Sequence, residues 1–331
     1  MVTFSHKIRA IRISLVISIV LMAVKFSAYL LTHSNAILTD AMESIVNVTA
    51  GAFALFSIWY ASLPRDENHP YGHGKIEFFS AGFEGGLIFI AAILVIVNAT
   101  LALFKGNHVH SLDTGMILTA VAGGINYFTG MYLVREGNKS NSLLMVASGK
   151  HLLSDTLTSI GLIVGLAIVW FTGLVWIDNI VAIIFGLIIL QTGYKLIRKS
   201  VTGLLDEADV KKLELIINEM NANRRERWID IHNLRVLKFG SKLHVDCHIT
   251  LPWYDSLEKS HDEIALLENL VRKTSGHDVE FFIHADPCVM PHSCKICQVS
   301  ECKYRQADFM KKIEWNTANI LPNKRHRFQD Q

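Results

Sequence analysis

Half of the 331 residues are hydrophobic, and 32 basic side chains nearly balance 30 acidic ones, giving a formal net charge of +2 at pH 7. The mean hydropathy of +0.30 is too high for an ordinary soluble domain, whereas a charged fraction of 19% is too high for a protein that lies wholly within a membrane. So small a net charge gives no electrostatic case for binding nucleic acid. The composition predicts a membrane part joined to a soluble part.

The first 200 residues contain apolar runs that are each long enough for the about 20 residues a helix needs to cross a bilayer. Six such runs lie at residues 10–32, 36–62, 77–104, 113–135, 143–171 and 177–198. The first run is too long for the apolar region of a cleavable signal peptide and lacks a small-residue cleavage pattern. We therefore predict a six-helix transmembrane bundle over residues 1–205.

Positive charges near the ends of these runs gather on one side of the predicted membrane. That side carries Lys7, Arg9, Arg12, Arg65, Lys75, Arg135, Lys139, Lys195, Arg198 and Lys199, and the other side shows only Lys105. An excess of Lys and Arg marks the cytoplasmic side. Six spans then place both termini in the cytoplasm, and we expect the chain to lie in the inner (plasma) membrane.

Two of the predicted spans carry a polar pair four residues apart, Glu43 with Asn47 and His151 with Asp155. This spacing places both side chains of a pair on one helix face. One pair alone would fit interhelical hydrogen bonding about as well as it fits an ion site. Ionisable groups in a membrane segment are costly and mark a functional site by default. Two pairs, each with a carboxylate, favour one metal ion held between the two spans.

From Asp206 onward the charges are spread throughout, and the pattern is that of a small α+β domain. The predicted elements are a helix at 207–222, strands at 231–239 and 242–251, a helix at 256–274 and a strand at 279–284. The order αββαβ predicts a three-stranded sheet with two helices on one face. Strand alternation points Cys247 into the core, whereas we expect His244 on the surface. Dimerisation would help so small a core.

Five short motifs follow one another along the chain. They are His33–Ala41 at the start of the second span, Asp66–Lys75 after it, His151-x-x-x-Asp155, Leu204–Asp206, and His284–Cys288 at the end of the soluble domain. This ordered set resembles the cation diffusion facilitator family of divalent-metal transporters over roughly residues 8–290. The resemblance implies a homodimer with six spans and a cytosolic ferredoxin-like domain over residues 206–290. It also implies export of zinc or a related divalent ion in exchange for protons.

The resemblance places the transport site at Glu43, Asn47, His151 and Asp155. Family members commonly carry Asp or His and then Asp at the first two positions, so the Asn47 amide is a departure. The imidazole suits zinc, iron, cobalt or nickel, whereas the oxygen-rich, less charged set leans toward manganese or ferrous iron. Zinc remains the default substrate. We expect Asp40 to support these ligands, the alternative being that it caps a break in the helix.

Proton exchange would follow from the same ligands, because metal binding requires deprotonated groups. His151 is the natural titrating member, since its unperturbed pKa is near 6.5. The runner-up hypothesis is a membrane-anchored metal sensor, for which the embedded His151–Asp155 pair would have no use. An enzyme has less support, because the sequence shows no His-Glu-x-x-His motif and no evident nucleophile constellation.

The resemblance also implies sites outside the spans. Asp66, His69 and His73 form a loop metal site, with a solvated turn as an equal alternative. Lys75 and Asp206 are expected to pair near the dimer junction and to couple the two domains. The cytosolic regulatory metal site, for one or two zinc ions at a dimer interface, comprises His232, His248, His261, His284 and Asp286.

The extension over residues 291–331 lies outside the resemblance. Together with the end of the soluble domain it contains a Cys-x5-Cys-x2-Cys-x4-Cys pattern formed by Cys288, Cys294, Cys297 and Cys302. A cytoplasmic setting disfavours disulfides and favours a metal site. A zinc site and a thiol-rich tail without metal stay equally open. The basic residues 324–327 predict a frayed, solvated end, with contact to anionic lipid as the alternative.

Overall fold

The computed structural model describes residues 4–32, 35–105, 114–172, 176–240, 242–275 and 278–328. Some side chains within its helices, those of Asp40 and Glu43 among them, lie outside the described set. The chain divides into two compact units, residues 1–205 and residues 206–331. Each unit has its own hydrophobic clusters.

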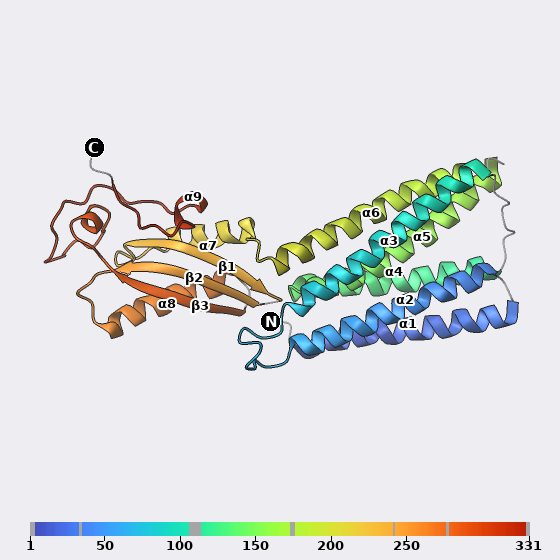
Figure 1. The fold of residues 1–331 in the computed structure, drawn as a ribbon, viewed down its shortest axis with the longest axis horizontal. Helices are drawn as coiled ribbons and strands as arrows, with labels where there is room; N and C mark the ends of the chain where they lie inside the picture. The colour runs from blue at the N-terminus through green and yellow to red at the C-terminus, as the bar shows by residue number, and fades with distance from the viewer. Residues whose placement is uncertain are drawn as a thin grey trace. The chain divides into compact units, whose positions relative to one another are not determined.

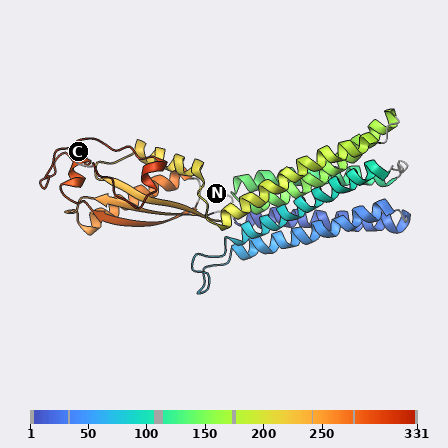
Figure 2. The same ribbon diagram turned by 45° about the horizontal axis from the view of Figure 1, so that its top comes forward.

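The first unit is built from long helices that run alongside one another (Figure 2). They are α1 (Phe4–Thr32), α2 (Asn35–Ala61), α3 (Ile76–Lys105), α4 (Thr114–Lys139), α5 (Leu143–Thr172) and α6 (Trp176–Leu204). Within the described residues, four stretches are long and apolar enough to cross a membrane: Ser5–Ser27, Ser44–Ala61, Ile76–Phe104 and Asn179–Leu204. Large apolar side chains such as Ile90 and Phe128 point outward, as a lipid-facing surface requires.

Glycines set the closest helix contacts in this unit, where α3 packs along α6 and α4 along α5. A Cβ added at Gly130 of α4 would lie 2.8 Å from the carbonyl oxygen of Gly149 in α5, and one at Gly149 would lie 2.7 Å from that of Gly130. Gly193 of α6 and Gly85 of α3 form a similar pair, in which a Cβ at Gly193 would lie 3.0 Å from the Gly85 oxygen. Only glycine permits this approach of two backbones.

The second unit contains α7 (Val210–Ala222), β1 (Asp230–Phe239), β2 (Lys242–Leu251), α8 (Leu257–Ser275) and β3 (Asp278–Pro287), as Figure 1 shows. The central strand β2 pairs antiparallel with β1 and parallel with β3. Asp209 caps α7, because its side chain accepts a hydrogen bond from the Lys212 backbone N–H. The observed order of elements is the αββαβ order expected from the periodicity.

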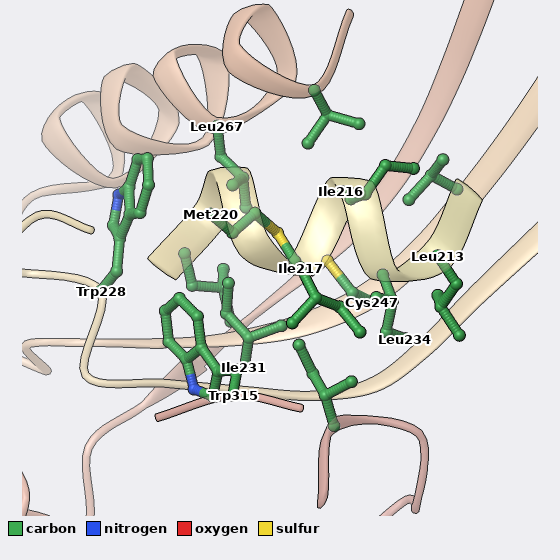
Figure 3. Packing of buried hydrophobic residues seen from close by; sticks show 14 of the residues in the cluster. Leu213, Ile216, Ile217, Met220, Trp228, Ile231, Leu234, Cys247, Leu267 and Trp315 are labelled. Atoms are coloured by element: carbon green, nitrogen blue, oxygen red, sulfur yellow. The ribbon is translucent and has the colours of Figure 1, made fainter. Parts of the chain in front are cut away.

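One face of the sheet forms the core with α7 and α8. Figure 3 shows Met220 of α7 beside Leu267 of α8, and Leu213 and Ile217 of α7 on the side of the strand residues Leu234 and Cys247. Cys247 is buried in this cluster. Burial, helped by the nearby Asp246 carboxylate, raises its pKa to about 12, so the thiol stays protonated. The prediction that Cys247 belongs to the core is confirmed.

The C-terminal segment follows β3 and contains little regular structure: the single turn η1 (His292–Lys295) and the short helix α9 (Thr317–Ile320). Its end is nevertheless held on the sheet. The backbone N–H of Asn233 donates to the Pro322 carbonyl, and Arg325 and His326 contact Asp286 and Asp230. The expectation of a frayed end at residues 324–327 is therefore wrong, because side-chain hydrogen bonds, which leave no periodic pattern, hold it.

His244 is also more buried than the sequence predicted. Its side chain is buried, with the ring of Phe239 at 4.7 Å between centroids and a Glu280 oxygen 3.5 Å from Nδ1. The prediction of a surface histidine is wrong because neighbouring strands supply cover on the sheet face that α7 and α8 leave open.

Candidate metal sites

Asn47 of α2 contacts both predicted ligands of α5, His151 and Asp155. Its Nδ2 donates a hydrogen bond of 2.7 Å to Oδ2 of Asp155, and its Oδ1 lies 2.8 Å from Nε2 of His151. His151 is buried and Asp155 is partly buried. The structure thus brings together three of the four residues predicted for the transport site. The side chains of Glu43 and Asp40 lie outside the described residues.

The hydrogen bonds of the Asn47 amide determine which nitrogen of His151 carries a proton. If the amide oxygen accepts from His151, then Nε2 of that ring carries a proton. This tautomer follows from the hydrogen-bond pattern rather than from an observed hydrogen. The same nitrogen can bind a metal only after that proton has left it. A carboxylate, an amide oxygen and an imidazole are all ligands that divalent transition metals accept.

Glu84 of α3 is an embedded carboxylate that the sequence analysis did not single out. Its side chain is buried, and Ser148 of α5 donates a hydrogen bond of 2.6 Å to Oε1. Its other oxygen has no hydrogen-bond partner within the described part of the chain. Ser148 lies three residues before His151, about one helical turn away. The available signal was an acid inside the apolar run 77–104.

The predicted loop residues come together after α2. Asp66 accepts a hydrogen bond of 2.6 Å from the His69 backbone N–H, its Oδ1 lies 2.9 Å from His69 Nδ1, and its Oδ2 lies 3.3 Å from His73 Nε2. Ligand atoms of all three residues lie within 4.8 Å of one another. His73 is buried beneath the ring of Tyr60, and Gly72 adopts a φ of +85° that suits glycine.

Strand register lines up three imidazoles across the sheet. His232 of β1 pairs with His248 of β2, which pairs with His284 of β3. Asp286 Oδ2 lies 3.2 Å from His248 Nδ1 and 3.6 Å from His232 Nε2, and these three residues have ligand atoms within 4.8 Å of one another. His284 Nδ1 lies 3.4 Å from Asp286 Oδ1. We call these four residues the sheet cluster.

His261 is not brought to the sheet cluster within one chain. It lies exposed on α8, and α8 packs on the opposite face of the sheet, against the hydrophobic core. A ligand role for His261 therefore requires a second copy of the domain.

Two carboxylates of this face are held ionised. Burial acts to raise the pKa of Asp286, but hydrogen bonds from Arg325 and His248 outweigh it and leave the pKa below its usual range. The pKa of Asp230 is lowered in the same way, with burial outweighed by bonds from His232 and His326. The sequence analysis missed Asp230 and these tail residues, since nothing in their spacing ties them to β1.

The remaining predicted residues fall into two groups. Lys75 precedes α3 in the first unit, whereas Asp206, with a φ of +57°, belongs to the second unit. Their pairing therefore stays a prediction. The four tail cysteines, Cys288, Cys294, Cys297 and Cys302, all line one small cavity.

Both units of the chain are similar to known proteins. Residues 11–205 match the family model described as cation efflux transmembrane domain, and residues 205–288 match that described as cation efflux protein, cytoplasmic domain. An uncharacterized transporter of Synechocystis is 30% identical over 273 residues, covering 82% of this chain and 87% of its own. The cation-efflux pump FieF of Shewanella oneidensis is 26% identical (84% and 93% covered), and the manganese efflux system protein MneP of Bacillus subtilis is 26% identical (83% and 94% covered).

Proposed function

Because the chain belongs to the cation efflux, or cation diffusion facilitator, family of membrane metal transporters, we propose that it exports a divalent transition-metal cation from the cytoplasm in exchange for protons. Zinc is the default substrate, and iron or manganese are the alternatives. The protein is a transporter rather than an enzyme. The proposal includes six membrane spans, both termini in the cytoplasm, and an inner-membrane location.

The observation that carries the proposal is the bridge between α2 and α5. Asn47 contacts both Asp155 and His151, so polar groups from two helices meet at one point between them. We assign the transport site to Asn47, His151 and Asp155, with Glu43 as the fourth ligand and Asp40 in support. An ion entering there would replace the hydrogen bonds that Asn47 now makes. Glu84, which Ser148 joins to α5 about one helical turn before His151, is proposed to take part in the exchange.

Proton coupling is supported by the protonation that this bridge implies. The imidazole nitrogen of His151 that faces Asn47 must lose its proton before it can bind a metal. A bound metal and that proton therefore exclude each other at the same atom. Such exclusion is the minimum requirement for exchange of the two ions.

The choice of metal depends on Asn47. A neutral amide leaves the site less negatively charged than one with three carboxylates, which favours a harder ion with oxygen preference. One relative carries manganese in its name, which supports keeping that ion among the substrates. An Asn47→Asp variant should shift preference toward zinc.

We further propose that the sheet cluster senses cytosolic metal in a homodimer. The donor set of three imidazoles and one carboxylate fits zinc. His261, exposed on α8, would contribute from a second copy. Lys75 and Asp206 are proposed to link the cytosolic domain to the spans. The loop residues Asp66, His69 and His73 form an accessory metal site at the cytoplasmic face of the membrane.

Transport into proteoliposomes with an imposed pH gradient tests the function. We expect metal uptake that follows the gradient in wild type and is lost in Asp155→Ala, whereas Asp308→Ala, at an exposed carboxylate of the tail, behaves as wild type. Counterflow with zinc, manganese, iron, cobalt and nickel, repeated with Asn47→Asp, would rank the substrates. Metal binding without any transport would instead support the membrane-anchored sensor. Transport that ignores the pH gradient would refute proton coupling.

A further inference from the structure

The first part of the C-terminal segment, around its four cysteines, has few means of its own to stay ordered. Between Cys288 and the end of the described chain the segment forms one 3-10 turn and one four-residue helix. The stretch around the cysteines has only a small apolar cluster, formed with Ile229 by Ile296, Cys297 and Val299, whereas Trp315 and Ile320 farther along the segment are buried in the main core. Segments with so little core are commonly held by disulfides or a metal. This first part of the segment therefore has room for a further source of stability.

Four cysteine thiols come together in this part of the C-terminal segment. Cys288 follows β3, Cys294 lies in η1, and Cys297 and Cys302 follow in the next turns. All four line one cavity of about 10 Å³, which is the room that a single water-sized guest requires. Cys247, the fifth cysteine, lies apart from them in the core between the sheet and the helices.

Backbone groups are arranged around these sulfur atoms. The N–H of Gln306 donates to Cys294 Sγ at 3.5 Å. Backbone N–H groups of Trp253 and Val299 likewise hydrogen-bond to Cys288 and Cys297. Three of the four sulfurs thus accept a backbone N–H, a contact that stabilises a thiolate more than a thiol.

Arg305 fixes the loop that presents the thiols. Its guanidinium donates to the carbonyl oxygens of Cys294 (3.0 Å), Cys297 (3.1 Å) and Val299 (2.7 Å), and its side chain lines the same cavity. Four thiolates around a divalent ion leave a net charge of −2, so a cation at this position is favourable.

The four thiols lie close together around this cavity. Burial raises the pKa of Cys288 and of Cys297, and neighbouring thiols add to the shift. A soft divalent cation reverses this preference, because thiolates are its ligands and bind it with loss of the proton. Within the described residues, the sets with ligand atoms all within 4.8 Å of one another are the loop and sheet sets. The sulfurs must therefore draw together to reach tetrahedral bonds of about 2.3 Å.

We propose that Cys288, Cys294, Cys297 and Cys302 form a tetrathiolate site for a structural zinc ion, which holds the C-terminal segment on the sheet. The two Cys-x2-Cys residues and the two flanking cysteines supply a closed set of four ligands, as structural zinc sites do. This zinc ion stays bound and is not one of the ions that cross the membrane. The proposal therefore does not depend on the transport function.

Cobalt titration of the full-length protein in detergent tests the site. After chelator treatment and reduction, we expect about one Co²⁺ per chain to bind with the strong sulfur-to-metal absorption of tetrahedral thiolate coordination, displaced by zinc. Histidine and carboxylate sites give no such band. Cys294→Ser and Cys297→Ser should lose it, whereas Cys247→Ala, a change at the core cysteine, should keep it. A wild-type protein that binds Co²⁺ without a thiolate band would overturn the proposal.

A second measurement needs no variant and so does not depend on how well a variant folds. Alkylation of the wild-type protein, followed by mass spectrometry, reports each cysteine separately. Zinc should slow modification of the four tail cysteines at least about tenfold, as expected for ligands in a closed site. Equal rates with and without zinc, or recovery of the four cysteines as two disulfides from freshly purified protein, would refute the site.

Discussion

The cluster between α2 and α5 and the cluster on the sheet use similar ligands but are assembled by different means. In the first, side chains of two helices meet through one amide, with contacts of 2.7 and 2.8 Å. In the second, backbone pairing of three strands sets the imidazoles side by side. Helix packing can change by small shifts of one helix along another, whereas strand register changes only when backbone hydrogen bonds break.

This difference suits the two clusters to different tasks. A site that must bind an ion and then release it on the other side gains from ligands on separate bodies. A site that measures a concentration gains from ligands whose spacing stays constant. The comparison therefore predicts that substitutions in the helical cluster act on transport rate and those in the sheet cluster act on metal affinity.

The largest effect is expected for Asp155→Ala. Removing this carboxylate should lower metal transport at least about 100-fold, because it deletes a ligand and leaves Asn47 without its acceptor. Metal binding to the sheet cluster, measured by isothermal titration, should not change. Transport within a few-fold of wild type, in a variant that elutes as wild type in size-exclusion chromatography, would contradict the assignment.

His232→Ala should produce the opposite pattern. It removes the most buried imidazole of the sheet cluster, so metal affinity there should fall about 10- to 100-fold. Transport at saturating metal should change little, since the helical cluster is intact. Isothermal titration and proteoliposome flux measure the two quantities. His6→Ala, at an exposed histidine of α1, is the control; a His232→Ala variant that lost flux at saturating metal would break the comparison.

Glu84→Gln tests whether the helical cluster extends into α3. The amide keeps an oxygen for the Ser148 hydroxyl but loses the ability to take up a proton. We expect transport to fall about tenfold, the lower end of the effect of altering a group beside metal ligands, with a weaker dependence on the pH gradient. Ser148→Ala removes only the hydrogen bond and should have less effect. Equal loss in both variants would assign Glu84 a structural role.

Arg325→Ala should give the smallest effect, and it should raise the metal affinity of the sheet cluster rather than lower it. Arg325 Nη2 lies 2.7 Å from Oδ1 of Asp286, so the guanidinium competes with a metal for that carboxylate. Metal affinity of the sheet cluster should rise up to about fivefold, because an ion pair of this exposure contributes up to about 1 kcal/mol. Titration in an Asp155→Ala background removes the contribution of the transport site. Arg327→Ala, at the exposed neighbouring arginine, should change nothing, and weaker binding in Arg325→Ala would refute the competition.

The periodic parts of the structure could be predicted from the sequence. Alternation in residues 242–251 predicted a strand with Cys247 facing the core, and the strand is Lys242–Leu251. The i, i+4 pair of His151 and Asp155 predicted a shared helix face, and both meet Asn47. Each depends on a repeat that local backbone geometry imposes.

The contacts of the C-terminal segment with the sheet could not be predicted. The tail residues Arg325 and His326 return to β3 and β1 through side-chain bonds, and no spacing rule encodes such a return. A register shift in β1 between His232 and Arg235, with Asn233 at a φ of +53°, likewise follows from packing. Glu84 was available to sequence reasoning, but an acid in an apolar run does not by itself identify its partner.

The interlocked glycines described above limit which helices can separate during a transport cycle. With Gly130 against Gly149 and Gly85 against Gly193, neither α4 and α5 nor α3 and α6 can slide past each other without a carbonyl oxygen striking the facing backbone. Each pair of helices should then move as one rigid body. Opening and closing of the ion path should then occur at helix contacts without such glycine pairs, and among the described residues the contact of α2 with α5 is one of them.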